Sequence, residues 1–176
     1  SRKGALDLLY EADIRNQSAI VIHDARKTET DVLIREYTSL LLQGISDNRR
    51  KIDELISTYA EGWDMDRMPA VDRNILRIGI YELLWSTEVP DSVAINEALE
   101  LAKTLSTDES AGYVNWILGR IASIKEDIVI KLEARNREHK VSKQVIIKVV
   151  KEPVIDFSVE ALDPFLEEYI VLRGVG

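Results

Sequence analysis

Apolar residues recur at helical spacing through most of residues 1–125. Ala5, Leu8, Leu9 and Ala12 show the i, i+3, i+4, i+7 spacing of one buried helix face. This spacing predicts a helix over residues 2–14. Comparable periodicity predicts further helices over about 31–43, 48–60, 70–86, 92–105 and 107–123.

The predicted helices differ in how much of their surface is apolar. Helix 70–86 is apolar nearly all round and is therefore expected at the centre of a bundle. The other helices carry narrower stripes that are expected to face the core: Val32, Leu33, Leu40, Leu41, Ile52, Leu55, Ile56, Tyr59, Ala94, Ala98, Leu101, Leu105, Val114, Ile117, Leu118 and Ile121.

Polar residues and glycine mark the boundaries of these helices. The stretch 15–30 is polar and lacks periodicity, so it is predicted to be a surface loop, and Gly44 is expected to interrupt or bend the helical region around it. Asp91 is expected to cap the helix that it precedes. Ser106 and Glu109 have the spacing of a capping box at the start of the last of these helices.

The C-terminal part of the chain follows a different pattern. Helical periodicity is expected to continue to about Glu138, and the β-branched run 145–150 then predicts a strand. Alternating apolar and polar residues over 155–160 predict a second strand. Asp163-Pro164 predicts the start of a short C-terminal helix.

These patterns divide the chain into a helical domain, residues 1–125, and an extension of unassigned role, residues 126–176. Cysteine is absent, which excludes disulfides and thiolate metal sites. No apolar run reaches the ~18 residues of a membrane span, and the N-terminal pattern is not that of a secretion signal. The absence of cysteine also permits a reducing compartment.

The net charge of −8 argues against general, sequence-independent binding to nucleic acid. Residues 52–125 carry thirteen Asp/Glu against six Lys/Arg. The simplest interpretation is that these acidic residues lie on a solvated surface. The alternative is that they bind a basic protein partner. Any contact with RNA would rely on local positive charge, supplemented by such a partner.

The sequence contains no recognisable catalytic constellation. Its two histidines, His23 and His139, both stand in polar surroundings and are expected at the surface. It has no zinc-protease motif, phosphate-binding loop or glycine-rich dinucleotide turn. Acidic pairs such as Asp64 and Asp66 suit helix starts and surface positions. The chain is therefore predicted not to be an enzyme and to need no cofactor or metal.

An aromatic stripe lies outside the core face of the helix over 107–123. Tyr113, Trp116 and Arg120 have the spacing i, i+3, i+7 and fall on a different face from the core stripe. Aromatic rings beside a guanidinium suit base stacking, worth about 1–3 kcal/mol per base. Two alternatives stay open: the extension packs over these aromatics, or they form a homodimer interface.

The first helix opens with basic residues. Arg2 and Lys3 occupy its first turn, and Tyr10 follows two turns along. A basic first turn runs against the helix dipole and is weakly disfavoured for stability. We interpret Arg2 and Lys3 as candidate phosphate contacts, although two exposed basic residues are also common by chance.

Several blocks of the chain carry a family resemblance. In chain order they are Arg2, Ala5-Leu6, Leu9-Tyr10, 71–83, Val89-Pro90, 93–98, 100–103, Asp108-Glu109-Ser110 and Tyr113-Val114-Asn115. These blocks resemble the NusB family in the same order: residues 71–83 resemble its central helix, and the last block is similar to its aromatic-Val-Asn motif. Together they cover about residues 1–125.

The resemblance implies an all-α fold of two small helical bundles and a bacterial, cytoplasmic role in transcription antitermination. It implies that the protein binds boxA RNA together with the ribosomal protein NusE. Through this complex the protein would act indirectly on the RNA polymerase elongation complex. At matching positions, Arg2, Tyr10, Glu109 and Tyr113 would face RNA, and Asp72 would face the protein partner. Residue patterns add three members to the RNA-binding set: Lys3, Trp116 and Arg120.

Two other functions stay open. Some rRNA methyltransferases carry a NusB-like domain, but they need a Rossmann-like domain with a cofactor loop, which the extension does not contain. A protein-only interaction module would result if the extension masked the RNA face. The chain departs from the family in having few basic residues around Arg2, and in carrying Trp116 where the family commonly has glycine.

Overall fold

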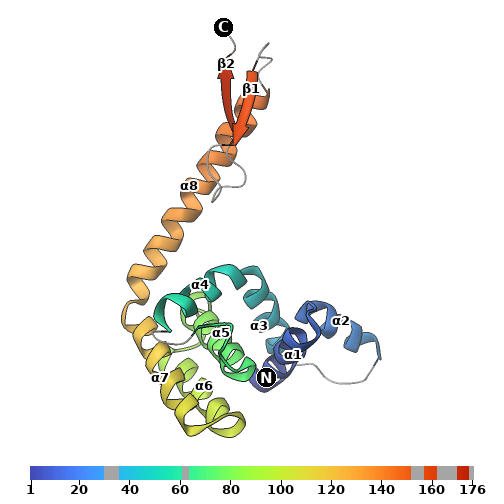
Figure 1. Cartoon of the computed structure of the whole chain (residues 1–176), viewed down its shortest axis with the longest axis vertical. Coiled ribbons are helices and arrows are strands. Elements are labelled where there is room, and N and C mark those ends of the chain that lie inside the picture. The colour runs from blue at the N-terminus through green and yellow to red at the C-terminus, as the bar shows by residue number, and fades with distance from the viewer. Residues whose placement is uncertain (30–35, 61–63, 152–156, 162–169, 175–176) are drawn as a thin grey trace. The chain divides into compact units, whose positions relative to one another are not determined.

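The computed structural model describes residues 1–29, 36–60, 64–151, 157–161 and 170–174 (Figure 1). The chain divides into two compact units, Ser1–Lys125 and Glu126–Gly176. Every element described in residues 1–124 is an α-helix, which confirms the predicted all-α class. The elements are α1 (Arg2–Arg15), α2 (Ala19–Glu29), α3 (Glu36–Asp47), α4 (Arg49–Tyr59), α5 (Ala70–Trp85), α6 (Asp91–Leu105), α7 (Asp108–Ser123), α8 (Lys125–Lys151), β1 (Phe157–Ala161) and β2 (Ile170–Gly174).

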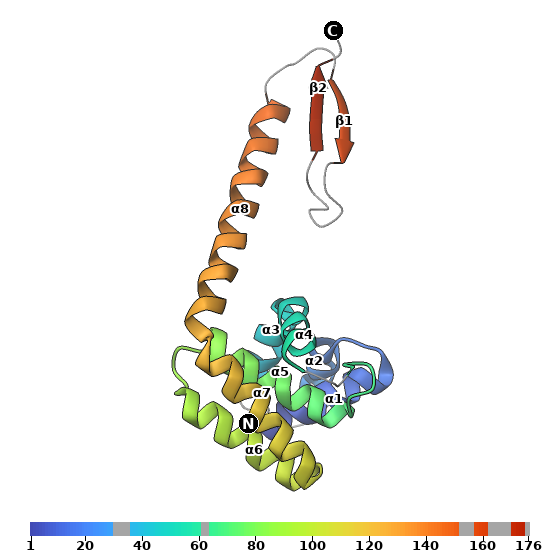
Figure 2. The same ribbon diagram turned by 60° about the vertical axis from the view of Figure 1, so that its left-hand side comes forward.

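Helix α5 lies at the centre of the first unit (Figure 2). It contacts α1, α3, α4, α6 and α7, and its side chains from Asn74 to Leu83 are buried without a break. Helices α1, α2 and α3 contact one another, as do α6 and α7. Two small bundles therefore share α5. A helix with apolar residues nearly all round is stable only where neighbours surround it, so the predicted central position is confirmed.

The apolar stripes predicted for α1 and α7 are buried throughout. Two other predicted core positions are wrong, because Leu40 is 47% exposed and Leu105 is 39% exposed. In α3 the core is formed instead by Leu41, Leu42 and Ile45, which are at most 2% exposed. The buried face of α3 is thus rotated from the predicted one. Val32 and Leu33, at the start of the predicted helix 31–43, lie outside the described residues.

A helix, α2, replaces most of the surface loop predicted over 15–30. Helix α1 ends at Asn16, whose φ of 50° is the left-handed geometry that asparagine tolerates at a helix end. Helix α2 then packs on α1 and α3 and buries Ile22 and His23. Few buried positions leave a weak sequence pattern, and packing on neighbours supplies the stability that this short helix lacks alone.

His23 is only 3% exposed, so its predicted surface position is wrong. Its two ring nitrogens lie 3.0 Å from the Ser39 hydroxyl on α3 and 3.1 Å from the carboxylate of neighbouring Asp24. These hydrogen bonds replace the water that a buried imidazole loses. His139, in contrast, is partly exposed on α8.

Gly44 does not interrupt α3, which continues through it to Asp47. A β-carbon built on Gly44 would lie 2.1 Å from the Cζ atom of Tyr81 on α5. Glycine therefore lets α3 approach the tyrosine ring of α5 closely. The sequence pattern predicts a helix breaker at this glycine. It gives no sign of the close contact, because the tyrosine that the glycine accommodates is distant in the chain.

Two helix starts differ by one residue from their predicted positions. The N-cap of α7 is Thr107 rather than Ser106, because Thr107 Oγ1 accepts a hydrogen bond from the Ser110 N–H at 3.1 Å. The N-cap of α6 is Pro90, and Asp91 is the first helical residue. A carboxylate in the first turn still interacts favourably with the helix dipole.

The strand predicted over 145–150 is wrong, because these residues belong to α8. Val145, Ile146, Val149 and Val150 are spaced i, i+1, i+4, i+5, which suits a helix face as well as a β-branched strand. Extending a helix that has already formed also costs less than starting a new element. The local preference for a strand is therefore overridden.

The second unit also contains a two-stranded antiparallel ribbon. β1 pairs with β2 so that Phe157 lies opposite Gly174 and Ala161 opposite Ile170. β1 overlaps the predicted strand over 155–160. The helix predicted from Asp163-Pro164 lies outside the described residues. None of the described helices has the combination of length and hydropathy that a membrane crossing requires.

Candidate nucleic-acid interface

The start of α7 is anchored to α5 by one buried hydrogen bond. Ser110, which is 4% exposed, donates from Oγ to Oδ2 of Asp72 at 2.7 Å. Asp72 is completely buried. The chain by itself thus offers no exposed Asp72 side chain, and the contact of Asp72 with a protein partner stays a prediction. Asp72 holds the first turn of α7 against α5.

Beyond this anchor, α7 carries the predicted aromatic stripe at the surface. The rings of Tyr113 and Trp116 stack with their centroids 6.4 Å apart and an interplanar angle of 22°. Trp116 is 43% exposed, and Glu109 and Arg120 are also exposed. Burial raises the pKa of the Tyr113 hydroxyl above its ordinary value. The structure thus places four predicted site residues on one helix, two of them as a stacked pair.

Arg2 does not offer a free guanidinium to a phosphate. Its Nε donates to both carboxylate oxygens of Glu82 on α5, at 2.8 and 3.0 Å, and its Nη1 donates to Glu97 on α6 at 3.1 Å. Glu82 is fully buried and also accepts a hydrogen bond from the Tyr37 hydroxyl. Burial alone would lower the pKa of Arg2, but Glu82 outweighs this and raises it. Arg2 is therefore a structural link between α1, α5 and α6. Its contact with RNA stays a prediction.

The two other predicted site residues of α1, Lys3 and Tyr10, are exposed. Lys3 has a side chain that is 61% exposed and pairs with Asp7 one turn on, at 2.8 Å. Tyr10 is 40% exposed. Arg2 contacts α5 at Glu82 and Ser110 contacts it at Asp72, positions about 15 Å apart along a helix. The starts of α1 and α7 therefore attach to opposite ends of α5, and the two parts of the predicted site do not form one cluster.

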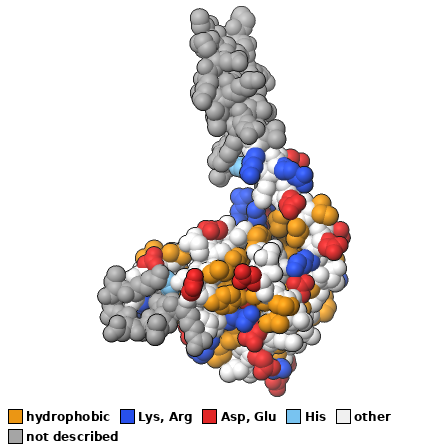
Figure 3. All heavy atoms as spheres, turned by 180° about the vertical axis from the view of Figure 1, so that it is seen from behind, with side chains coloured by type: hydrophobic (Ala, Val, Ile, Leu, Met, Phe, Trp, Pro, Cys, Tyr) orange, Lys and Arg blue, Asp and Glu red, His pale blue; other side chains and the backbone are white. Residues whose placement is uncertain are grey.

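Hydrophobic side chains reach the surface on one face of the helical unit, with acidic and basic side chains among them (Figure 3). Exposed apolar surface of this kind is typical of interaction sites. The large exposed apolar side chains of the described part of this unit are Tyr10, Ile14, Val21, Leu40, Val93, Leu105 and Trp116.

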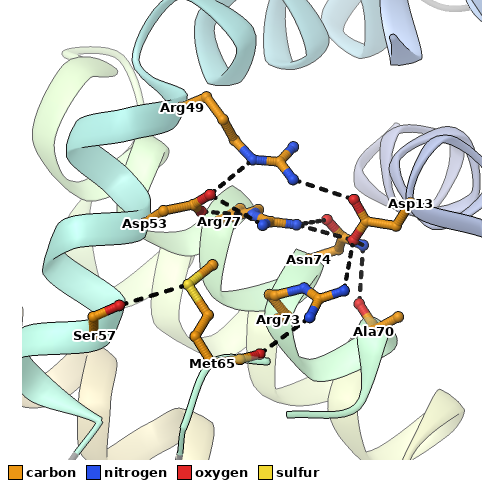
Figure 4. A network of polar contacts seen from close by, with 9 residues as sticks. All are labelled: Asp13, Arg49, Asp53, Ser57, Met65, Ala70, Arg73, Asn74 and Arg77. Carbon is orange, nitrogen blue, oxygen red and sulfur yellow. Dashed lines mark hydrogen bonds and ion pairs between the residues drawn. The ribbon is translucent and has the colours of Figure 1, made fainter. Parts of the chain in front are cut away.

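A network of charged side chains joins α1, α4 and α5 and was not predicted from the sequence (Figure 4). Arg77, with a side chain 4% exposed, donates to Asp53 at 2.8 and 3.1 Å, to Asp13 at 3.0 Å and to Asn74 at 2.9 Å. Arg49 also donates to both carboxylates. Arginine at i and i+4 of an otherwise apolar helix, as in Arg73 and Arg77, was the available sequence signal.

This network borders a pocket of about 590 Å³ that is lined by residues of α1, α2, α3, α4 and α5. The arginine donors that face it are largely engaged with carboxylates, so the network is built for structure rather than for chemistry. Within the described ranges, no group of three His, Asp or Glu side chains is arranged to hold a metal ion.

Asp13 is expected to make the stability of the fold depend on acid pH. Burial alone would raise the pKa of Asp13, but Arg77, Asn74, Arg73 and Arg49 together hold it below its ordinary value. As pH falls, the Asp13 carboxylate therefore takes up a proton in the unfolded chain before it does so in the folded chain. The contribution of Asp13 to the free energy of unfolding is complete above about pH 4–5 and is lost as pH falls through the pKa of the folded state. Urea unfolding followed by circular dichroism between pH 6 and pH 2.5 measures this loss.

The Asp13→Asn variant should show a flatter dependence of unfolding free energy on pH over that range. Asp7→Asn is the matched control, because Asp7 lies on the same helix with its side chain 54% exposed. Equal pH dependence in the wild-type chain and the Asp13 variant would contradict the assignment.

Comparison with known proteins decides the family. The sequence model of the NusB family matches residues 1–123, which include α1 to α7. This chain belongs to the NusB family. Transcription antitermination protein NusB of Saccharopolyspora erythraea is 50% identical over 138 residues, which cover 77% of this chain and 93% of that protein. The Thermobifida fusca protein of the same name is 48% identical over 128 residues, or 73% and 90% of the two chains.

Solved structures agree with the family assignment. Thermotoga maritima NusB superposes with a TM-score of 0.62 at 36% identity, covering 69% of this chain and 87% of that one. A structure of antitermination factors NusB and NusE in complex with double-stranded RNA shares the fold, with a TM-score of 0.61 at 23% identity over 69% and 92% of the chains. The function of this NusB-family chain is transcription antitermination.

Proposed function

We propose that this NusB-family protein binds boxA-type RNA together with NusE and thereby helps RNA polymerase to read through terminators in the bacterial cytoplasm. The observation that carries the proposal is the stacked Tyr113–Trp116 pair, which exposes an aromatic face on α7 within the family match. Single-stranded RNA is recognised mainly by stacking of splayed bases and by backbone contacts.

Each site residue has a distinct part in this proposal. Trp116 and Tyr113 stack on bases, while the exposed cations Arg120 and Lys3 contact phosphates. Glu109 lies in the first turn of α7, where its carboxylate can accept hydrogen bonds from base or ribose donors. Tyr10 adds an exposed ring on α1.

NusE is proposed to supply part of the positive charge that the RNA needs. Residues 52–125 carry thirteen acidic against six basic residues, and the charge of Arg2 is taken up by Glu82. A basic protein partner would relieve this deficit at the RNA backbone. A solved complex of NusB and NusE with double-stranded RNA has a NusB chain of the same fold.

A binding role rather than a catalytic one fits the extent of the match. The chain covers 93% and 90% of two relatives that are themselves named antitermination proteins. A NusB-like domain inside a larger methyltransferase would instead match only a part of its relatives. The match therefore favours an antitermination factor over a methyltransferase.

The proposal is tested by binding of a fluorescent boxA RNA, with and without purified NusE, over a series of salt concentrations. We expect tight binding only when NusE is present, with affinity falling as salt rises because phosphate contacts release counterions. An RNA of the same length and composition in scrambled order is the control for specificity. Equal affinity for both RNAs, or no binding with NusE present, would overturn the proposal.

A further inference from the structure

The second unit contains a strongly basic helix. Between positions 131 and 151 of α8 the sequence has seven basic and two acidic residues. The same unit continues into acidic sequence, so the basic character is confined to the helix. The basic residues are Lys131, Arg135, Arg137, Lys140, Lys143, Lys148 and Lys151, and the acidic ones are Glu133 and Glu138.

The described side chains of this helix are open to solvent. Lys131, Arg135, Arg137 and Lys140 are all exposed. Arg137 lies 3.9 Å from Glu133, at the outer limit of an ion pair, and both side chains are more than 60% exposed. Exposed pairs of this kind hold charge only weakly, so the guanidinium remains available to a stronger anion.

Two pairs of cations on α8 add like-charge repulsion to the helix, beside the favourable pair of Glu133 and Arg137. Lys131 and Arg135 stand at i, i+4, and Arg137 and Lys140 stand at i, i+3, where like charges repel. A helix selected only to be soluble and stable would alternate charge signs along these rows. The pattern therefore indicates a negatively charged ligand that compensates the repulsion when it is bound.

The density of positive charge matches a nucleic-acid strand. Residues 131 to 140 span about 14 Å of helix and carry four exposed cations, or about one per 3–4 Å of axis. A nucleic-acid strand in a double helix carries one phosphate per about 3.4 Å of axis. An acidic protein surface would rarely present negative charge at such regular and close spacing over that length.

We propose that α8 binds the sugar–phosphate backbone of RNA and adds phosphate contacts to the few that the helical unit offers. This inference rests on the proposed function, because it assumes that the chain is brought to RNA. The aromatic pair on α7 would stack on bases, whereas α8 would add affinity that does not depend on base sequence. Residues 126–176 thereby gain a role in RNA binding.

The test compares the full-length chain with a variant carrying Lys131→Gln, Arg135→Gln, Arg137→Gln and Lys140→Gln. Glutamine removes the charge and keeps a good helix former. With NusE present, we expect boxA RNA affinity to fall more than tenfold at low salt. The slope of log affinity against log salt should fall by about 3 for four lost contacts, at about 0.7 per phosphate of a single strand.

The matched control carries Arg15→Gln, Arg50→Gln, Arg67→Gln and Lys103→Gln, four exposed cations of the first unit. It has the same net charge as the α8 variant and should retain most of the affinity and the slope. An equal loss in both variants would overturn the proposal in favour of a general effect of net charge. Circular dichroism of both variants verifies that the helices are retained.

Three further outcomes separate this proposal from the proposed function. If the α8 variant binds boxA RNA with wild-type affinity while Trp116→Ala binds it weakly, the role of α8 is overturned and the proposed function stands. Loss of NusE binding without any change in the salt slope would show that α8 is a protein contact instead. Absence of RNA binding by the wild-type chain would overturn both.

Discussion

Replacing Trp116 with alanine is expected to weaken binding of boxA RNA about 5- to 150-fold in the presence of NusE. One base stacked on an aromatic side chain contributes about 1–3 kcal/mol, and each 1.4 kcal/mol corresponds to a factor of about ten. Trp116 is 43% exposed and stacks on Tyr113, so part of its side chain is accessible to RNA. Fluorescence anisotropy of labelled RNA measures the change.

Leu105→Ala is the matched control for this prediction. Leu105 is 39% exposed at the end of α6, and its truncation removes a surface apolar side chain without removing a stacking surface. Its RNA affinity should stay within about twofold of the wild type, since it offers no π-face. A Trp116 variant that binds as tightly as the Leu105 variant would exclude Trp116 from the RNA surface.

Replacing Arg77 with alanine is expected to lower the free energy of unfolding by about 3 kcal/mol. Removing one partner of a buried ion pair costs about 3–5 kcal/mol, because the other charge is left unpaired. Asp13 and Asp53 have side chains that are 14% and 28% exposed and keep Arg49 as a partner, which favours the lower end of that range. Urea denaturation followed by circular dichroism at neutral pH measures the loss.

Arg15→Ala serves as the control, because the Arg15 side chain is 60% exposed and pairs with Glu11 at the surface of α1. Exposed pairs contribute about 0–1 kcal/mol, so this variant should be nearly as stable as the wild type. Arg77→Lys keeps the charge but not the forked donor geometry, and an intermediate loss is expected. Equal stability of the Arg77 and Arg15 alanine variants would show that the network contributes little.

The candidate site was only partly predictable. The helical spacing of Tyr113, Trp116 and Arg120 was enough to separate them from the buried stripe of α7, because a helix buries only part of its circumference. The sequence could not predict that Arg2 is engaged within the fold whereas Lys3 is exposed, since the two residues are adjacent and equally basic. Arg2 meets a buried carboxylate on α5, eighty positions away in the chain, whereas Lys3 meets only its own helix.

The sequence by itself determined the helical class, the central place of α5 and the buried stripes of α1 and α7. These features depend on periodicity, which is a local property of the chain. Only the tertiary structure decided that Asp72 is buried, that Gly44 accommodates Tyr81, and that α2 is a helix.

The same holds for the charged network around Arg77 and for the helical state of residues 145–150. The physical reason is shared by all these cases. A buried charge, a close approach of two helices and a weakly periodic helix are each stabilised by residues distant in sequence. Their partners become neighbours only when the helices have packed.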